Sequence, residues 1–133
     1  MTLKSEDRKN IIIYRLEKAV KTLDEAKAVS ALGYWTLAAN RLYYAAYYAS
    51  ISLLIHSGIE ASTHNGVVRM IGSEFVRNGK LSVDDSKLLS RLFTMRQTGD
   101  YEDFFDWSEK DIRPLIPQVE EYIQRISQMI TTL

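Results

Sequence analysis

Residues 40–49, which read NRLYYAAYYA, form the middle of a long and almost uncharged stretch from Tyr34 to His56. The stretch contains neither Gly nor Pro, and this composition favours an uninterrupted helix. Its apolar stripe at helical period consists of Trp35, Ala38, Leu42, Ala46, Ala49 and Leu53. The adjacent face carries Asn40, Tyr43, Tyr47, Ile51 and Leu54. Because such a helix is apolar most of the way round, we expect other helices to surround it.

The same stretch is nearly long enough to cross a bilayer, but Asn40 and Arg41 lie well inside it. An unpaired Arg inside a bilayer costs about 2.5–3.5 kcal/mol. No flanking cluster of basic residues sets an orientation across a membrane. We therefore expect a core helix at this position and no membrane association.

Length and composition narrow the class of protein. The chain has 133 residues, so we expect a single helical domain over residues 1–133. Its 17 basic and 17 acidic side chains balance, so no net positive charge attracts nucleic acid, and it has no Cys. The absence of Cys rules out disulfides and Cys-based metal sites. Residues 1–10 are polar and lack the apolar region of a signal peptide. These features predict a cytoplasmic protein.

Glycines divide the remaining sequence into helices. Gly33, Gly58, Gly79 and Gly99 each follow a helical pattern, and a left-handed Gly commonly ends a helix. The first helix is therefore expected from about Ser5 to Leu32.

Residues that commonly cap helices mark the expected starts of the later helices. Ser62 or Thr63 can cap the third helix, and residues 82–85, SVDD, resemble a capping box that opens the fourth. A further cap at residues 108–111 precedes the last helical pattern.

An aromatic and acidic loop is expected over residues 99–107, before the last helix. Pro114 and Pro117 lie early in that helix, and at least one of them should kink it or delay its start. With no alternating strand pattern in the sequence, we predict an all-α fold, an up-and-down bundle of four to five antiparallel helices.

Neither a metal site nor a cofactor site is indicated. His56 and His64 are the only histidines, and they lack the spacing of a helical metal site. The glycines are isolated, so no Gly-rich phosphate loop is present. We expect no metal and no cofactor.

Arg96 has two interpretations. It can stabilise the end of the fourth helix or pair with Asp100. Alternatively, it can present its guanidinium group to a phosphate, with Tyr101 stacking on a base or donating a hydrogen bond. The sequence pattern leaves both interpretations open.

Arg41 and His64 pose similar choices. Within an apolar helix, Arg41 must be paired, lie at an exposed edge or belong to a site, and structural pairing is the more common outcome. His64 lies beside an expected helix N-terminus, where it acts either as a surface residue of the cap or as an acid or base.

Three motifs together resemble the HEPN superfamily. They are residues 40–45, NRLYYA, residues 63–67, THNGV, and Arg96 followed by Asp100 and Tyr101. They occur in the right order, and the resemblance covers nearly the whole chain. More narrowly, the chain resembles the branch of small bacterial and archaeal proteins catalogued as an uncharacterised protein family.

The resemblance implies a helical bundle that forms a homodimer. It also implies a partner, a small nucleotidyltransferase encoded nearby, within a toxin–antitoxin pair. Active members are metal-independent ribonucleases in which an Arg holds the scissile phosphate and a His, after four to six intervening residues, handles protons.

This sequence departs from the ribonuclease motif at the His. The positions where the His could fall are Tyr101, Glu102 and Asp103, and Tyr has an unperturbed pKa of about 10, too high for a proton shuttle near neutrality. The expected function is therefore binding of a nucleotidyltransferase partner, or of a nucleotide or RNA phosphate, near Arg96. Arg96, Asp100, Tyr101 and Arg41 are the candidate phosphate-binding residues.

Two alternatives to this binding function stay open. The first is a metal-independent ribonuclease in which Arg96 acts with His64 or Tyr101. The second is a purely structural helical bundle, in which the arginines pair only with local acids.

Overall fold

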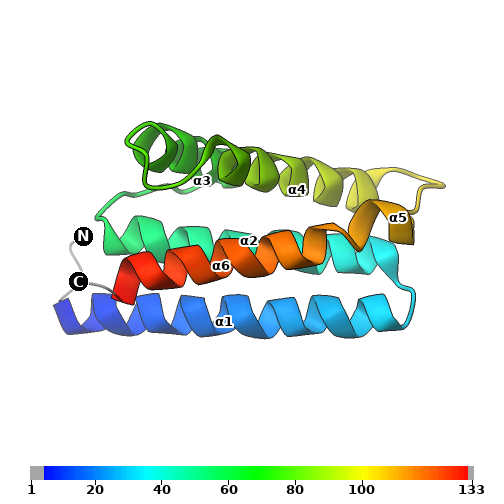
Figure 1. The fold of residues 1–133 in the computed structure, drawn as a ribbon, viewed down its shortest axis with the longest axis horizontal. Coiled ribbons are helices and arrows are strands. Elements are labelled where there is room, and N and C mark those ends of the chain that lie inside the picture. Colours follow the sequence, from blue (N-terminus) through cyan, green and yellow to red (C-terminus); the bar gives the residue numbers. More distant parts are fainter. Residues whose placement is uncertain (1–4, 132–133) are drawn as a thin grey trace.

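The computed structural model of the chain describes residues 5–131, and it is all-α with no strand among these residues. Antiparallel helices pack into a bundle as predicted (Figure 1). Its elements are α1 (Ser5–Ala31), α2 (Trp35–His56), α3 (His64–Ile71), a π-helical turn η1 (Gly72–Val76), α4 (Val83–Tyr101), the single turn α5 (Glu109–Ile112) and α6 (Leu115–Thr131).

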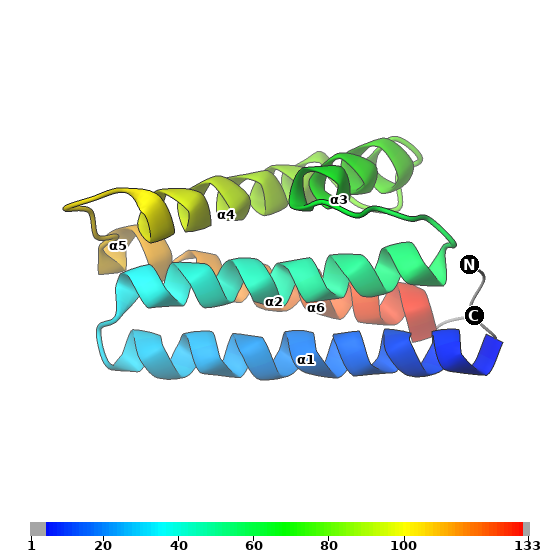
Figure 2. The ribbon, with the colours of Figure 1, turned by 180° about the vertical axis from the view of Figure 1, so that it is seen from behind.

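The Tyr-rich helix α2 is the centre of the bundle, which confirms the expectation that other helices surround it. It contacts α1, α3, α4, α5 and α6. Figures 1 and 2 show α2 and α6 side by side in a middle layer, with α1 on one side and α3 and α4 on the other. The predicted apolar stripe is buried at Ala38, Leu42, Ala46, Ala49 and Leu53, and Tyr43 on the adjacent face is also fully buried.

Three of the four predicted glycine helix ends are correct. Gly33, Gly58 and Gly79 have φ angles of 82°, 73° and 79°, the left-handed conformation that Gly adopts without a steric penalty. Each follows the end of a helical segment, and α1 ends at Ala31, one residue before the predicted end.

The prediction that Gly99 ends the fourth helix is wrong. Helix α4 continues through Gly99 to Tyr101, so Asp100 also lies in the helix and the loop begins later than expected. A Cβ added at Gly99 would lie 2.9 Å from Cγ2 of Thr36 and 3.3 Å from the Trp107 ring. The position therefore requires Gly for close packing and not for a left-handed turn.

The capping predictions are confirmed. Thr63, one of the two candidates, caps α3 by accepting a hydrogen bond from the backbone N–H of Gly66 at 2.9 Å. Ser82 and Asp85 form a reciprocal capping box at the start of α4. The Asp111 carboxylate accepts hydrogen bonds from Ser108 at the start of α5.

The predicted interruption near the two prolines is also confirmed. Helix α5 ends at Ile112, and α6 begins at Leu115, directly after Pro114. Pro117 lies in the first turn of α6, where a missing N–H leaves no intrahelical hydrogen bond unmade.

Polar contacts between residues distant in the sequence also join the helices. Arg8 of α1 donates hydrogen bonds of 2.9 and 2.8 Å to the carbonyls of Ile55 and His56, so it satisfies carbonyls that the end of α2 leaves without partners. Inside the bundle, the hydroxyl groups of Ser50 and Tyr122 are 2.6 Å apart. Within residues 5–131, the structure contains no helix that combines the length and apolar character of a bilayer span.

Candidate functional site

Arg96 lies near the C-terminal end of α4 and points toward α2. Only 8% of the residue is exposed. Its Nη1 atom is 3.6 Å from the Asp100 carboxylate, one helical turn further along. The guanidinium carbon lies over four aromatic rings, at 5.2 Å from the Tyr43 ring, 5.6 Å from Tyr44, 5.7 Å from Phe93 and 6.0 Å from Tyr101. The charge is thus held by rings and by one carboxylate.

This arrangement leaves part of the guanidinium group without a partner. Among the residues that the structure describes, the Nε atom of Arg96 is buried and makes no hydrogen bond. The ion pair with Asp100 is also longer than the roughly 2.7–2.9 Å of a charge-assisted hydrogen bond. A buried donor without a partner is unfavourable, so the described contacts leave the hydrogen-bonding capacity of Arg96 incompletely used.

Asn40 of α2 connects the two predicted arginines. Its Oδ1 accepts hydrogen bonds from Nε and Nη2 of Arg41, at 3.0 and 2.7 Å, and its Nδ2 donates to Asp100 at 3.0 Å. Arg41 also pairs with Glu25 of α1 at 3.3 Å. The expectation that Arg41 is paired is confirmed, and its guanidinium group lies at the edge of the bundle with the side chain 30% exposed.

On the other side of Arg96, Tyr43 reaches His64 at the first turn of α3. The Tyr43 hydroxyl is 2.5 Å from Nδ1 of His64, and the imidazole stacks on the Tyr47 ring with centroids 4.4 Å apart. Burial raises the pKa of Tyr43 well above its ordinary value. Burial, together with the positive charge of Arg96, lowers the pKa of His64. The hydrogen bond therefore joins two groups that are both neutral at pH 7.

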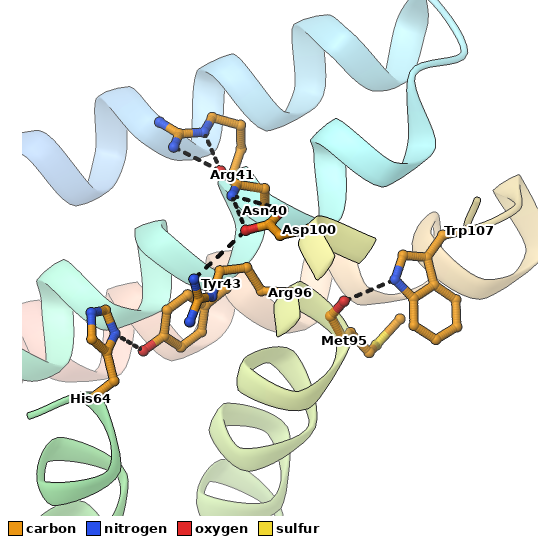
Figure 3. Close-up of polar contacts among 8 residues, drawn as sticks. All are labelled: Asn40, Arg41, Tyr43, His64, Met95, Arg96, Asp100 and Trp107. Atoms are coloured by element: carbon orange, nitrogen blue, oxygen red, sulfur yellow. Dashed lines mark hydrogen bonds and ion pairs between the residues drawn. The ribbon is translucent and has the colours of Figure 1, made fainter. Parts of the chain in front are cut away.

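The structure brings four of the five sequence-predicted candidates, all but Tyr101, into one polar cluster, shown in Figure 3. The residues of the cluster come from α2, α3 and α4. In order of contact, they are Arg41, Asn40, Asp100, Arg96, Tyr43 and His64. Tyr101 lies beside Arg96 with 74% of its surface exposed.

Sequence reasoning missed the roles of Asn40 and Tyr43. Both occur in the motif at residues 40–45, and they are three residues apart on one face of α2. An Asn within an apolar helix is a signal in itself, because a buried amide needs partners. The partners, Asp100 and His64, could not be identified from the sequence.

The loop after α4 is fixed to the bundle beside this cluster. The backbone N–H of Trp107 donates to the Thr36 hydroxyl at 2.8 Å, and the indole N–H donates to the Met95 carbonyl at 2.9 Å (Figure 3). These bonds hold the end of α4 against α2 and thereby fix the position of Arg96. Within residues 5–131, no group of three or more His, Asp or Glu side chains is arranged to hold a metal ion.

Comparison with known proteins assigns this arrangement to a family. Residues 13–129 match the HEPN domain family. A "UPF0332 protein" of Thermotoga maritima is 32% identical over 127 residues, which cover 96% of each chain. A "UPF0332 protein" of Archaeoglobus fulgidus is 28% identical over 87% of this chain and 92% of its own.

A third relative carries a functional name. The protein named "Putative toxin MJ0142" of Methanocaldococcus jannaschii is 24% identical over 86% of this chain and 78% of its own. These matches confirm the resemblance seen in the three motifs. The chain belongs to the HEPN domain family and, within it, to the small prokaryotic UPF0332 proteins.

Proposed function

We propose that this chain is the HEPN component of a toxin–antitoxin pair and that its polar cluster binds a phosphate group of a nucleotide or RNA. The observation that carries the proposal is the state of Arg96, a nearly buried guanidinium group whose Nε has no partner among the described residues. Two relatives from Methanocaldococcus jannaschii carry the name "Putative toxin", which supports the cellular role.

The surroundings of Arg96 support binding of a nucleotide and not of an isolated anion. Guanidinium groups match the geometry of phosphate oxygens, and the exposed Tyr101 ring lies 6.0 Å from the Arg96 guanidinium carbon. In this proposal Arg96 contacts the phosphate and Tyr101 stacks on the base. Asp100, whose side chain is 28% exposed, accepts a hydrogen bond from a ribose hydroxyl, and Arg41 lies at the outer edge as a further cation.

The same proposal includes protein partners. The HEPN resemblance implies that the domain, residues 1–133, forms a homodimer in the cytoplasm and associates with a small nucleotidyltransferase encoded beside it. Sedimentation of the purified chain tests the homodimer, and co-purification with the product of a neighbouring gene tests the partner. A monomer that binds neither a neighbour nor a nucleotide contradicts this part of the proposal.

Titration with uridine 5′-monophosphate tests the phosphate site. Replacing the exposed Tyr101 removes one base stack, so we expect Tyr101→Ala to lower affinity about tenfold. Arg96→Lys keeps the charge but loses the planar guanidinium group, and we expect it to weaken binding as well. Tyr34→Ala is the matched control, because Tyr34 is 59% exposed and lies outside the cluster. Equal affinity of all four proteins contradicts the proposed site.

One observation favours a second function, a metal-independent ribonuclease. His64 is oriented by Tyr43 and its pKa is lowered, so the neutral imidazole can accept a proton near pH 7. The test is cleavage of single-stranded RNA in excess chelator by the wild type, Arg96→Ala and His64→Ala. Activity that both substitutions abolish supports this function, whereas activity that neither changes comes from a contaminating nuclease.

A purely structural bundle is the remaining alternative. Under it, the contacts of Arg96 with Asp100 and the rings are its whole role, and no nucleotide binds to the wild type. The titration with uridine 5′-monophosphate therefore separates this alternative from the proposed function.

A further inference from the structure

A second arginine repeats the state of Arg96 on the opposite side of α2. Arg15 of α1 also has a buried Nε with no hydrogen-bond partner among residues 5–131, and no ion pair within that range involves Arg15 or its neighbour Lys18. The Arg15 guanidinium carbon lies 5.9 Å from the Tyr48 ring, and Nζ of Lys18 lies 4.8 Å from the same ring. The Arg15 guanidinium group is therefore held mainly by aromatic contact, whereas Arg96 also pairs with Asp100.

The two arginines are at opposite edges of one aromatic surface. We call it the tyrosine face, and it consists of the partly exposed Tyr44, Tyr47 and Tyr48 of α2. The ring centroids of Tyr44 and Tyr48 are 5.9 Å apart, and Arg96 lies 5.6 Å from the Tyr44 ring. Figure 2 shows α2 between α1 and α4, the helices that supply Arg15 and Arg96.

The charges around this face favour an anionic ligand. Lys18 shares a hollow of about 390 Å³ with Lys21 and Arg41, and the acids in its lining are Glu17 and Glu25. Glu25 is already paired with Arg41. Positive charge therefore remains on the α1 side of the tyrosine face, in addition to Arg96 on the α4 side.

The spacing of these groups limits the size of the ligand. The rings of Tyr44 and Tyr48 connect the two guanidinium groups, because Arg96 lies over Tyr44, Arg15 lies over Tyr48 and the two rings are neighbours. A ligand that reaches both arginines must therefore carry two anionic groups separated by units that lie against aromatic rings. Nucleotides joined by phosphates meet this requirement, because every base has an aromatic face.

We propose that Arg15, supported by Lys18, is a second phosphate-binding position, and that the ligand is a single-stranded oligonucleotide of at least two nucleotides. One phosphate lies at Arg96 and a second lies at Arg15. The base between them lies on the tyrosine face, and the base on the other side of Arg96 stacks on Tyr101. This inference rests on the proposed function, because Arg96 supplies the first position. It adds a ligand length and a residue that the motif around Arg96 does not include.

The experiment compares two probes, uridine 5′-monophosphate and 5′-phosphorylated diuridylate, on the full chain. We expect the wild type to bind the dinucleotide more tightly. Arg15→Gln should lower dinucleotide affinity about tenfold and reduce the dependence of affinity on salt by about one phosphate contact, with mononucleotide affinity unchanged. Arg69→Gln, which removes an exposed Arg of α3, is the matched control and should change neither affinity.

Lys18→Gln provides a second variant in case the partly buried Arg15 is needed for folding, which thermal unfolding of each variant will show. We expect Lys18→Gln to weaken dinucleotide binding about threefold. The inference is overturned if the mononucleotide binds in an Arg96-dependent way while neither Arg15→Gln nor Lys18→Gln weakens dinucleotide binding. If the wild type binds neither probe, the proposed function fails as well.

Discussion

Replacing Arg96 by Met separates a structural from a functional role for this residue. The substitution keeps an unbranched side chain of similar reach but removes the charge and all donors. If Arg96 is retained for ligand binding, the variant should be about as stable as the wild type and should lose nucleotide affinity. Residues of a binding site are commonly retained for function although they contribute little to stability.

The magnitude follows from the contacts of Arg96. The substitution removes an ion pair of 3.6 Å with a partly exposed Asp100, worth about 0.3–1 kcal/mol. It also removes the cation–π contacts with the surrounding rings, worth about 0.5–2 kcal/mol in total. In return it eliminates the buried Nε, which has no hydrogen-bond partner within residues 5–131 and whose burial costs about 1–3 kcal/mol. The change in the free energy of unfolding should therefore lie within about 2 kcal/mol of zero.

Urea unfolding followed by circular dichroism measures this change, and titration with uridine 5′-monophosphate measures binding. Leu92→Ala is a control in the same helix, because Leu92 is buried in the core and its truncation should cost about 2–5 kcal/mol. A loss for Arg96→Met as large as that of Leu92→Ala refutes the reasoning, because Arg96 would then be essential to the fold. Unchanged nucleotide affinity in a folded variant refutes the binding role.

Three further predictions concern stability. Ser50→Ala leaves the buried Tyr122 hydroxyl without its Ser50 partner and should lower the free energy of unfolding by about 1–3 kcal/mol. Urea unfolding measures this loss, and the comparison variant Tyr122→Phe should lose less. Arg8→Ala removes two hydrogen bonds to the end of α2 and should cost about 1.5–3 kcal/mol; an unchanged melting temperature would contradict this. Burial raises the pKa of Tyr43 and Tyr122 above the value of about 10 in the unfolded chain, so the unfolded state releases these protons first. The contribution of these two groups to the free energy of unfolding should be fully present below about pH 10 and should fall as the pH rises further. Unfolding of Tyr43→Phe, measured as a function of pH, should show a smaller fall.

Local features of the sequence were sufficient to predict most of the helical architecture. Apolar residues at helical period predicted α2 and its central position, and the capping residues Thr63 and Ser82 marked where α3 and α4 begin. These signals succeed because caps and periodicity depend on residues within one or two turns of each other. The i, i+4 pair of Arg96 and Asp100 was also within reach of the sequence, because it lies within one turn of α4.

The error at Gly99 had a different cause. Gly is common both at helix ends and where two backbones approach closely, and the sequence does not distinguish these uses. Only the tertiary structure shows that Thr36, from another helix, and Trp107, from the following loop, occupy the space of a Cβ.

The candidate site depends on contacts between residues far apart in the chain. Asn40 meets Asp100 across 60 positions, and Tyr43 meets His64 across 21. A helical pattern states which face of each helix is buried but not how far two helices are shifted along each other. That shift is set by the packing of the whole core. The sequence by itself therefore determined the helices and named Arg96 as a candidate. Only the tertiary structure decided which side chains surround Arg96, and among residues 5–131 its packing leaves the Nε atoms of Arg96 and Arg15 without a hydrogen-bond partner.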